Sequence, residues 1–288
     1  MSDLLTRFAS YSDLHQSPMH AGVMRRIGWQ VAGQPGSQIF HRSLGPFTIA
    51  KLQRPKVIDL DWLKSFRRSH HTLTTYIEPN LTSSLTQGLH VEPFAHSCTS
   101  LLDLKPSEHS ILASFSQKTR YNVVRTLRQN NLNIISSLSP ASPSGGSHHL
   151  TDFFTLHADW SRQKNVIGYS LPLLNAVMSS FAQAGELHLA YHGSSLVASL
   201  LVLYHDSVAT YWAAFASPEG YRLYAPTLLT WTAIQSAKQH GCDIFDFGGI
   251  YDPRYPKMYK KWQGFTKFKS GFNPEVISYP PTTLQLGW

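Results

Sequence analysis

Hydrophobic and polar positions alternate in a way that predicts both strands and helices in the first half of the chain. Gly45–Gln53, Leu73–Ile77 and Ser100–Leu104 are rich in β-branched and apolar residues, and we expect each to form a strand. The spacing of apolar residues in Asp59–His70 is helical instead. A second, long helix is expected from Ser107, a suitable cap residue, to about Asn131.

The second half has a clearer order of elements. Two amphipathic helices are followed by three strands with short polar turns between them, then by a helix with Pro226 near its start, then by a strand. Such an order predicts an α+β domain with a mixed sheet flanked by helices. The expected elements are Leu150–Gln163, Leu171–Ala184, Glu186–Tyr191, Leu196–Tyr204, Ala209–Phe215, Leu228–His240 and Cys242–Phe247.

One polar segment interrupts the pattern near the middle of the chain. Ser136–His149 reads SSLSPASPSGGSHH and is rich in Ser, Pro and Gly, which is typical of a linker or a long surface loop. We therefore predict two domains, residues 1–140 and residues 141–288.

Composition restricts the function classes. The 288 residues are 42% hydrophobic and carry a formal net charge of +8, which suits a folded protein that meets an anionic partner or simply has a basic surface. Two cysteines form no disulfide framework, and the fifteen histidines show no metal-ligand spacing, so we expect no metal or cofactor. The first ten residues lack the apolar core of a signal peptide, which favours a cytoplasmic location.

Four segments of the chain carry motifs that resemble those of one enzyme family. They are Gln16-Ser17 with Gly28-Trp29, and Lys118–Asn122, which reads KTRYN. The two most specific are CDIFDFGGI at Cys242–Ile250 and GFTKFKSGFNPEVISY at Gly264–Tyr279. In this order they resemble the N-terminal Q-S…G-W segment, the basic helix and the two C-terminal motifs of the FemABX family, which transfers amino acids from aminoacyl-tRNA to peptidoglycan precursors.

The resemblance implies a fold of two GNAT-like domains, here without the coiled-coil arm of some family members. It implies that an amine of a peptidoglycan stem peptide attacks the ester of aminoacyl-tRNA, so the expected partners are charged tRNA and a nucleotide-linked or lipid-linked muropeptide. A lipid-linked precursor implies peripheral contact with the inner face of the membrane. Because the ester is already activated, alignment and stabilisation of the oxyanion suffice, and no cofactor is needed.

The same resemblance implies a set of catalytic residues near the C-terminus. Lys269 matches the position that faces the oxyanion or the tRNA terminus, and Phe268 would shape the pocket for the acceptor end or stack on a base. Asp246 would orient the amine or cap a backbone turn. The alternative is that Phe268 packs in the core and the lysines are solvated.

The implied substrate-binding residues come from both halves. Glu78 would present a carboxylate to the acceptor, and Gly248 and Gly249 would allow close backbone approach. Arg120, with Lys118, Arg125 and Arg128, would hold phosphates, or would form a solvated helix face. Tyr211 and Tyr224 would line the cleft or would pack in the core. Lys267, two residues before Lys269 in the same motif, and Arg25 are the remaining candidates for substrate binding.

Two departures from the family pattern bear on the substrates. The family's diphosphate-binding lysine and arginine fall on Met24 and on Gly168-Tyr169, so Arg25 or Arg162 would have to substitute. The rival function is acyl transfer from acyl-CoA, but Arg222–Thr227 lacks the glycines of a pyrophosphate loop, and Pro226 removes an N–H donor. A non-catalytic nucleic-acid-binding protein of the same fold is the third reading.

Overall fold

The computed structural model describes residues 2–83, 88–93, 95–138 and 147–287. The chain divides into two compact units that are interleaved in sequence. The first unit comprises Met1–Thr99, Gly249–Gln263 and Val276–Trp288, and the second comprises Ser100–Gly248 and Gly264–Glu275. Among the described residues, no helix combines the length and hydropathy needed to cross a membrane.

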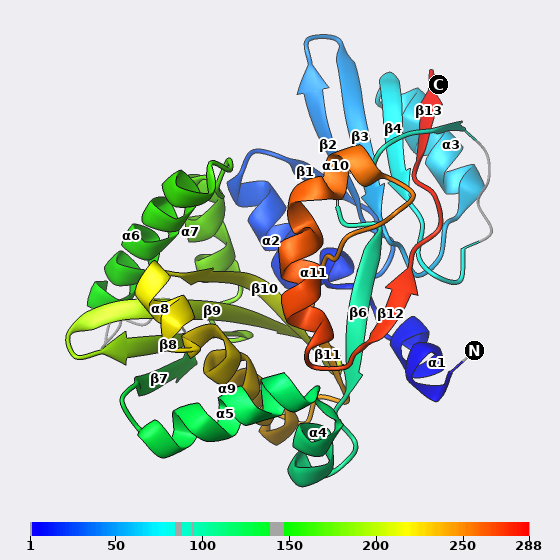
Figure 1. Ribbon diagram of the computed structural model, residues 1–288. Helices are drawn as coiled ribbons and strands as arrows, with labels where there is room; N and C mark the ends of the chain where they lie inside the picture. The colour runs from blue at the N-terminus through cyan, green and yellow to red at the C-terminus, as the bar shows by residue number, and fades with distance from the viewer. Residues whose placement is uncertain (1, 84–87, 94, 139–146, 288) are drawn as a thin grey trace. The chain divides into compact units, whose positions relative to one another are not determined.

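The first unit contains a six-stranded sheet in the order β1-β2-β3-β4-β13-β5. β3 and β4 run parallel, and β13, from the end of the chain, lies antiparallel beside β4 (Figure 1). β13 is also antiparallel to β5. The strands are β1 Gln30–Ala32, β2 Ile39–Leu44, β3 Phe47–Gln53, β4 Thr72–Glu78, β5 Leu89–His90 and β13 Thr283–Leu286.

Helices bury apolar residues of this first sheet. Leu63 and Phe66 of α3, Leu60–Ser69, pack with Ile39, Leu52 and Ile77. Ala21 and Met24 of α2, Pro18–Arg26, pack with Phe40. The other short helical segments among the described residues of this unit are α1 Asp3–Ser10, η1 Leu14–Gln16, α10 Pro256–Tyr259 and η2 Lys260–Trp262.

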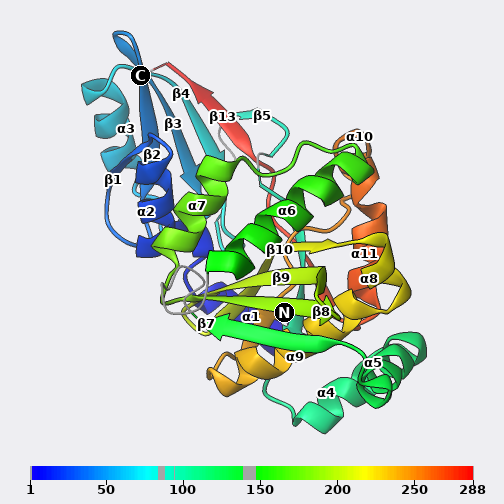
Figure 2. The ribbon, with the colours of Figure 1, turned by 90° about the vertical axis from the view of Figure 1, so that its left-hand side faces the viewer.

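The second sheet has seven strands in the order β12-β6-β11-β10-β9-β8-β7, and all of them except β12 lie largely in the second unit. Figure 2 shows α6 and α7 on one face of this sheet and α5 and α9 on the other. The strands are β6 Cys98–Asp103, β7 Asn133–Leu138, β8 Gly185–His192, β9 Ser195–His205, β10 Val208–Ala216, β11 Ile244–Asp246 and β12 Glu275–Ser278. The helices are α4 Glu108–Ser114, α5 Gln117–Gln129, α6 Ser147–Lys164, α7 Leu171–Ser180, α8 Pro218–Arg222, α9 Ala225–Gln239 and α11 Gln263–Ser270.

The pairing of strands at the centre of the second sheet is irregular. β10 and β11 run parallel for only three residue pairs, from Val208↔Ile244 to Thr210↔Asp246. β10 then continues to Ala216, and its register with β9 shifts between Tyr211 and Ala213. A shift of this kind bends the strand and re-aims its side chains. β10 and β11 therefore separate just beyond Asp246.

The long helix expected from Ser107 to Asn131 is wrong, because two helices occupy this stretch. Phe115 has extended backbone angles (φ −60°, ψ 153°) and ends α4, and Ser116 then caps α5 by accepting the N–H of Thr119. The backbone N–H of Ser116 donates to the carbonyl of Gly271. A serine that satisfies a helix N-terminus and also ties it to another segment favours a break over continuous helix.

The predicted linker is in part regular structure. Ser136, Ser137 and Leu138 belong to β7, which pairs with β8 at the edge of the sheet, and a helix has begun by Ser147. Residues 139–146 of the predicted linker lie outside the described residues. The division into domains of residues 1–140 and 141–288 stays a prediction, and the compact units follow a different, interleaved course along the chain.

Candidate functional site

Asp246 lies where β10 and β11 separate, and it fixes the turn that follows. Its side chain is 6% exposed and accepts the backbone N–H of Gly248 at 2.8 Å. Gly248 has a φ of +67°, and a Cβ there would lie 3.2 Å from the carbonyl oxygen of Tyr211. Glycine is therefore suited to this position by its conformation and by the close approach of β10.

Lys269 brings a buried cation to the same end of the sheet. It lies in the last turn of α11 and is only 8% exposed, and its Nζ lies 5.4 Å from the centre of the Tyr211 ring. Burial lowers the pKa of Lys269 to about 8, against the attraction of Asp246, which raises it. The side chain does not extend into bulk solvent.

Tyr211 joins these charges to α9. Its side chain is hydrogen-bonded to Thr230, whose hydroxyl donates to the carbonyl of Pro226 at 2.8 Å. Burial raises the pKa of the Tyr211 phenol well above its usual value, and the nearby Tyr221 raises it further. The phenol therefore stays neutral. Thr230 was not a candidate from the sequence, since a threonine inside an apolar helix gives no signal of the ring that it supports.

The residues on either side of Lys269 have different surroundings. Phe268 packs against the core cluster of the second unit and meets Phe272 edge to face, with 5.3 Å between ring centres. Lys267 is exposed. The packing of Phe268 agrees with the alternative that we gave for it, and its role toward substrate stays a prediction.

Tyr224 stands at the start of α9, with a left-handed backbone (φ +56°). The guanidinium of Arg125 lies 5.4 Å from the centre of its ring. The N–H groups of Thr227 and Leu228 both donate to the Tyr224 carbonyl, at 3.0 and 3.2 Å, and Pro226 has none. Few N–H groups of this helix start are therefore available to an anion.

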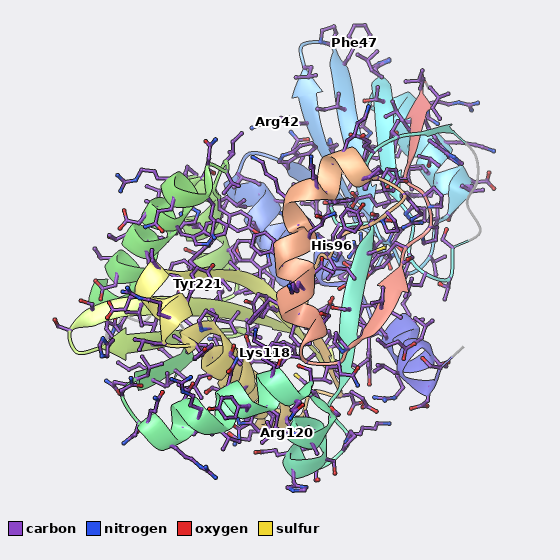
Figure 3. All side chains as sticks on the ribbon, in the orientation of Figure 1. Arg42, Phe47, His96, Lys118, Arg120 and Tyr221 are labelled. Atoms are coloured by element: carbon purple, nitrogen blue, oxygen red, sulfur yellow. The ribbon has the colours of Figure 1, made fainter. Side chains whose placement is uncertain are left out.

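Arg120 has a structural partner that the sequence did not reveal. Its Nη1 donates to the carbonyls of Ala113 and Phe115, at 2.7 and 3.1 Å, and so caps the end of α4 (Figure 3). Lys118, Arg125 and Arg128 are exposed on α5. Three of the four cations therefore remain as candidates for phosphate, and Arg120 is engaged with backbone.

Glu78 belongs to the first unit, at the end of β4. It is 4% exposed, and its carboxylate accepts the side-chain amide of Gln53 at 3.0 Å and the N–H of Ala95 at 2.7 Å. Gly249, also in this unit, leaves no room for a side chain, because a Cβ would lie 2.2 Å from the Trp262 ring. The group that comes close to the backbone of Gly249 is thus the side chain of Trp262. Its role toward substrate, like that of Glu78, stays a prediction.

The positions where the family's phosphate-binding cations were expected hold residues that pack against other parts of the protein. Met24 is 2% exposed inside the first unit, whereas Arg25 beside it is exposed. Gly168 lies so close to α6 that a Cβ would be 2.4 Å from the Ser161 hydroxyl and 2.6 Å from Nε2 of His157. Gly168 and these neighbours line a hollow of about 480 Å³ beside α6, and the exposed Arg162 also lines it.

The N-terminal Gln16-Ser17 pair has a structural explanation. The Gln16 amide donates to the carbonyls of Gln38 and Gln53 and accepts the N–H of Gln38, which joins η1 to β2 and β3. Ser17 caps α2 by accepting the N–H of His20. Among the described residues, no group of three or more His, Cys, Asp or Glu side chains is placed to hold a metal ion.

Comparison with known proteins tests the resemblance to the FemABX family. The sequence model of the FemAB family matches residues 163–282. No curated protein matches the chain significantly. Among solved structures, FemX matches with a TM-score of 0.79 at 14% identity, over 99% of this chain and 95% of its own. The predicted resemblance to the FemABX family is confirmed.

Two other structures support the fold. The C-terminal domain of a putative lysylphosphatidylglycerol synthetase from Agrobacterium fabrum has a TM-score of 0.64 at 16% identity, over 99% of this chain and 90% of its own. A tandem GNAT protein from the clavulanic acid pathway has a TM-score of 0.50 at 12% identity, over 89% and 81%. The predicted α+β fold with GNAT-like domains is thereby confirmed.

Proposed function

We propose that this acyltransferase of the FemAB family moves an amino acid from aminoacyl-tRNA to an amine of a peptidoglycan precursor. The observation that carries the proposal is the buried ammonium of Lys269 beside Tyr211 and Asp246, where β10 and β11 separate. Aminoacyl-tRNA is a cytoplasmic molecule, so the proposed reaction belongs to the cytoplasm.

The reaction requires charge stabilisation more than a nucleophilic side chain. The acceptor amine attacks the ester carbonyl, and its oxygen becomes negative in the tetrahedral intermediate. The C–O bond to the ribose then breaks, and the proton lost by the amine ends on the ribose oxygen. A preorganised cation in a water-poor site stabilises such an oxyanion, and the removal of one donor typically costs about 2.7–4 kcal/mol. Lys269 has the charge and the burial that this role needs.

The neighbours of Lys269 give it a fixed position. Tyr211 presents its ring to the ammonium, and its own hydroxyl is held by Thr230. The charge of Asp246 raises the pKa of Lys269 against the effect of burial, while the Asp246 carboxylate accepts the N–H of Gly248. In this proposal Lys269 is the catalytic residue, and Tyr211 and Asp246 are positioning residues.

The start of α9 favours tRNA over acyl-CoA as the donor. Acyl-CoA enzymes of this fold bind a pyrophosphate with successive N–H groups at a helix N-terminus. Here Pro226 lacks an N–H, and the next two N–H groups bond to Tyr224. Tyr224 and the exposed cations of α5 are left as the groups that would meet a nucleic acid.

The experiment is transfer from charged tRNA by the wild type and by Lys269→Met. We expect the wild type to increase the mass of a nucleotide-linked or lipid-linked muropeptide by one aminoacyl residue. Lys269→Met should lower kcat by about 10²–10³ while it keeps tRNA affinity. Lys257→Met, which removes an exposed lysine of α10, is the charge-matched control and should retain activity.

Three outcomes contradict parts of the proposal. Acetyl addition from acetyl-CoA with no transfer from tRNA would show that the donor is wrong. Equal rates for Lys269→Met and wild type would remove Lys269 from the mechanism. Tight tRNA binding with no transfer to any muropeptide, unchanged by the Lys269 substitution, would favour a non-catalytic binding protein.

A further inference from the structure

The hairpin between β2 and β3 carries large apolar side chains at its tip. Leu44 and Phe47 pair across the turn and are 52% and 37% exposed, and all residues from 42 to 47 are exposed. Gly45 makes the turn with a φ of +62°, and no atom lies within 4 Å of the position of its Cβ. Figure 3 shows Phe47 at the end of this hairpin, with Arg42 further back along it.

Such a tip differs from an ordinary surface turn. Its central residues, Gly45 and Pro46, are ordinary turn residues, but the two residues that flank them, Leu44 and Phe47, are large and apolar. A third large apolar residue, Leu73, is 38% exposed on the neighbouring strand β4, where Thr72 pairs with Thr48. Apolar side chains gathered at one exposed place mark an interaction surface.

Cations surround the base of this tip. Arg25 and Arg26 are exposed in the last turn of α2. Arg42 joins them, because its guanidinium donates to the carbonyls of Gly28 at 3.1 Å and Ile27 at 3.4 Å, just after that helix. The sequence from residue 14 to residue 58 contains no Asp or Glu. The surface behind the tip is therefore positive without nearby acidic side chains from its own segment.

We propose that the β2–β3 tip, residues 42–47, docks onto an anionic membrane surface. Two residues of strand separate Arg42 from Leu44, which is about 7 Å at the usual rise of a strand. This matches the depth of about 5–10 Å over which interfacial proteins place their apolar groups below the lipid head groups. Leu44 and Phe47 enter the acyl boundary while the exposed Arg25 and Arg26 meet the phosphates, and Arg42, held by the carbonyls of Gly28 and Ile27, adds its charge beside them.

The chemistry of the tip favours a lipid surface over a nucleic acid or a second copy of the chain. Single-stranded nucleic acid is bound by several aromatic faces on which successive bases stack, and among Leu44, Pro46 and Phe47 only Phe47 offers one. A second copy would bring the same three arginines toward the first, and like charges oppose such a contact. An anionic bilayer is complementary to both parts of the surface.

The test is co-sedimentation of the full chain with vesicles of phosphatidylcholine alone or mixed with phosphatidylglycerol. We expect binding only to the mixed vesicles, weakened by salt. The double variant Leu44→Gln, Phe47→Gln should reduce binding at least about tenfold, since it removes the inserted apolar groups. The matched control is Leu127→Gln, Val276→Gln, which replaces two side chains that are 53% and 61% exposed elsewhere and should bind as the wild type does.

The outcomes decide the proposal independently of the acyl transfer. Thermal melting of both double variants checks that the fold is kept. The inference is overturned if the wild type fails to bind the mixed vesicles, or if both double variants bind equally. It is also overturned if the tip variant instead loses binding to a short RNA or loses self-association in analytical ultracentrifugation. None of these results depends on whether the chain uses aminoacyl-tRNA.

Discussion

A lysine that is 8% exposed must be stabilised by its surroundings or lose its proton, and Lys269 is close to that balance. Its pKa of about 8 means that the ammonium is present below pH 8 and is lost as the pH rises above it. If the ammonium meets the oxyanion, the rate should fall about tenfold for each further pH unit. Arginine keeps its charge throughout this range, so Lys269→Arg should not show this fall.

Comparing the wild type with Lys269→Arg cancels the effect of pH on the acceptor amine. Deprotonation of the acceptor amine raises the rate of both as the pH rises, so the quantity to measure is the ratio of the kcat of wild type to that of Lys269→Arg. We expect this ratio to decrease through pH 8. A ratio that stays constant from about pH 7 to pH 9.5 would show that the charge on Lys269 does not enter the rate-limiting step.

The sequence could predict Asp246, Gly248 and Lys269 as site residues, but not the residues that hold them in position. Asp246 ends a short strand, Gly248 follows it, and Lys269 lies in a recognisable motif, so each was a candidate. Their meeting depends on the register shift near Tyr211, and the fixed ring depends on Thr230. Neither has a local signal, because both result from packing between elements distant in the chain.

At the scale of elements, the continuous apolar runs between residues 185 and 216 predicted their strands well, since strands buried on both faces need such runs. The break between α4 and α5 was missed. Ile111 and Phe115, both buried, keep a helical spacing up to the break, so the apolar pattern alone does not show that the helix ends there. Ser116 and Arg120 make the break through polar contacts that periodicity does not record.

Arg120 should therefore be important for stability. Arg120→Met removes the hydrogen bonds to the carbonyls of Ala113 and Phe115, and we expect it to lower the free energy of unfolding by about 1–3 kcal/mol. Lys118→Met, two residues earlier and exposed, should change it by less than about 0.5 kcal/mol. Urea unfolding followed by circular dichroism measures both. Equal effects of the two substitutions would show that the cap on α4 contributes nothing.

At the scale of the whole molecule, strands from late in the chain pair with strands from much earlier in the sequence. β13, at residues 283–286, lies between β4 and β5 in the first sheet. β6, from the first half of the sequence, pairs with β11 from the second half. A sequence read from one end to the other finds a polar segment in the middle and predicts a boundary there. It cannot find these pairings, because pairing between distant strands leaves no local pattern.

The pairing of these distant strands predicts how fragments of the chain behave. A fragment of residues 1–140 lacks β13, so β4 and β5 lose the strand that lies between them. A fragment of residues 141–288 lacks β6 and α5. It therefore leaves β11 without one of its partner strands and exposes part of the apolar core that α9 helps to form. Unpaired buried strand edges and exposed apolar cores do not form stable domains. We expect neither fragment to unfold cooperatively in urea, and we expect co-expression of the two to restore a soluble complex with the melting behaviour of the full chain. Cooperative unfolding of either fragment by itself would instead support two consecutive domains that meet near residue 140, and the strand exchange would then be an addition to folds that are already stable.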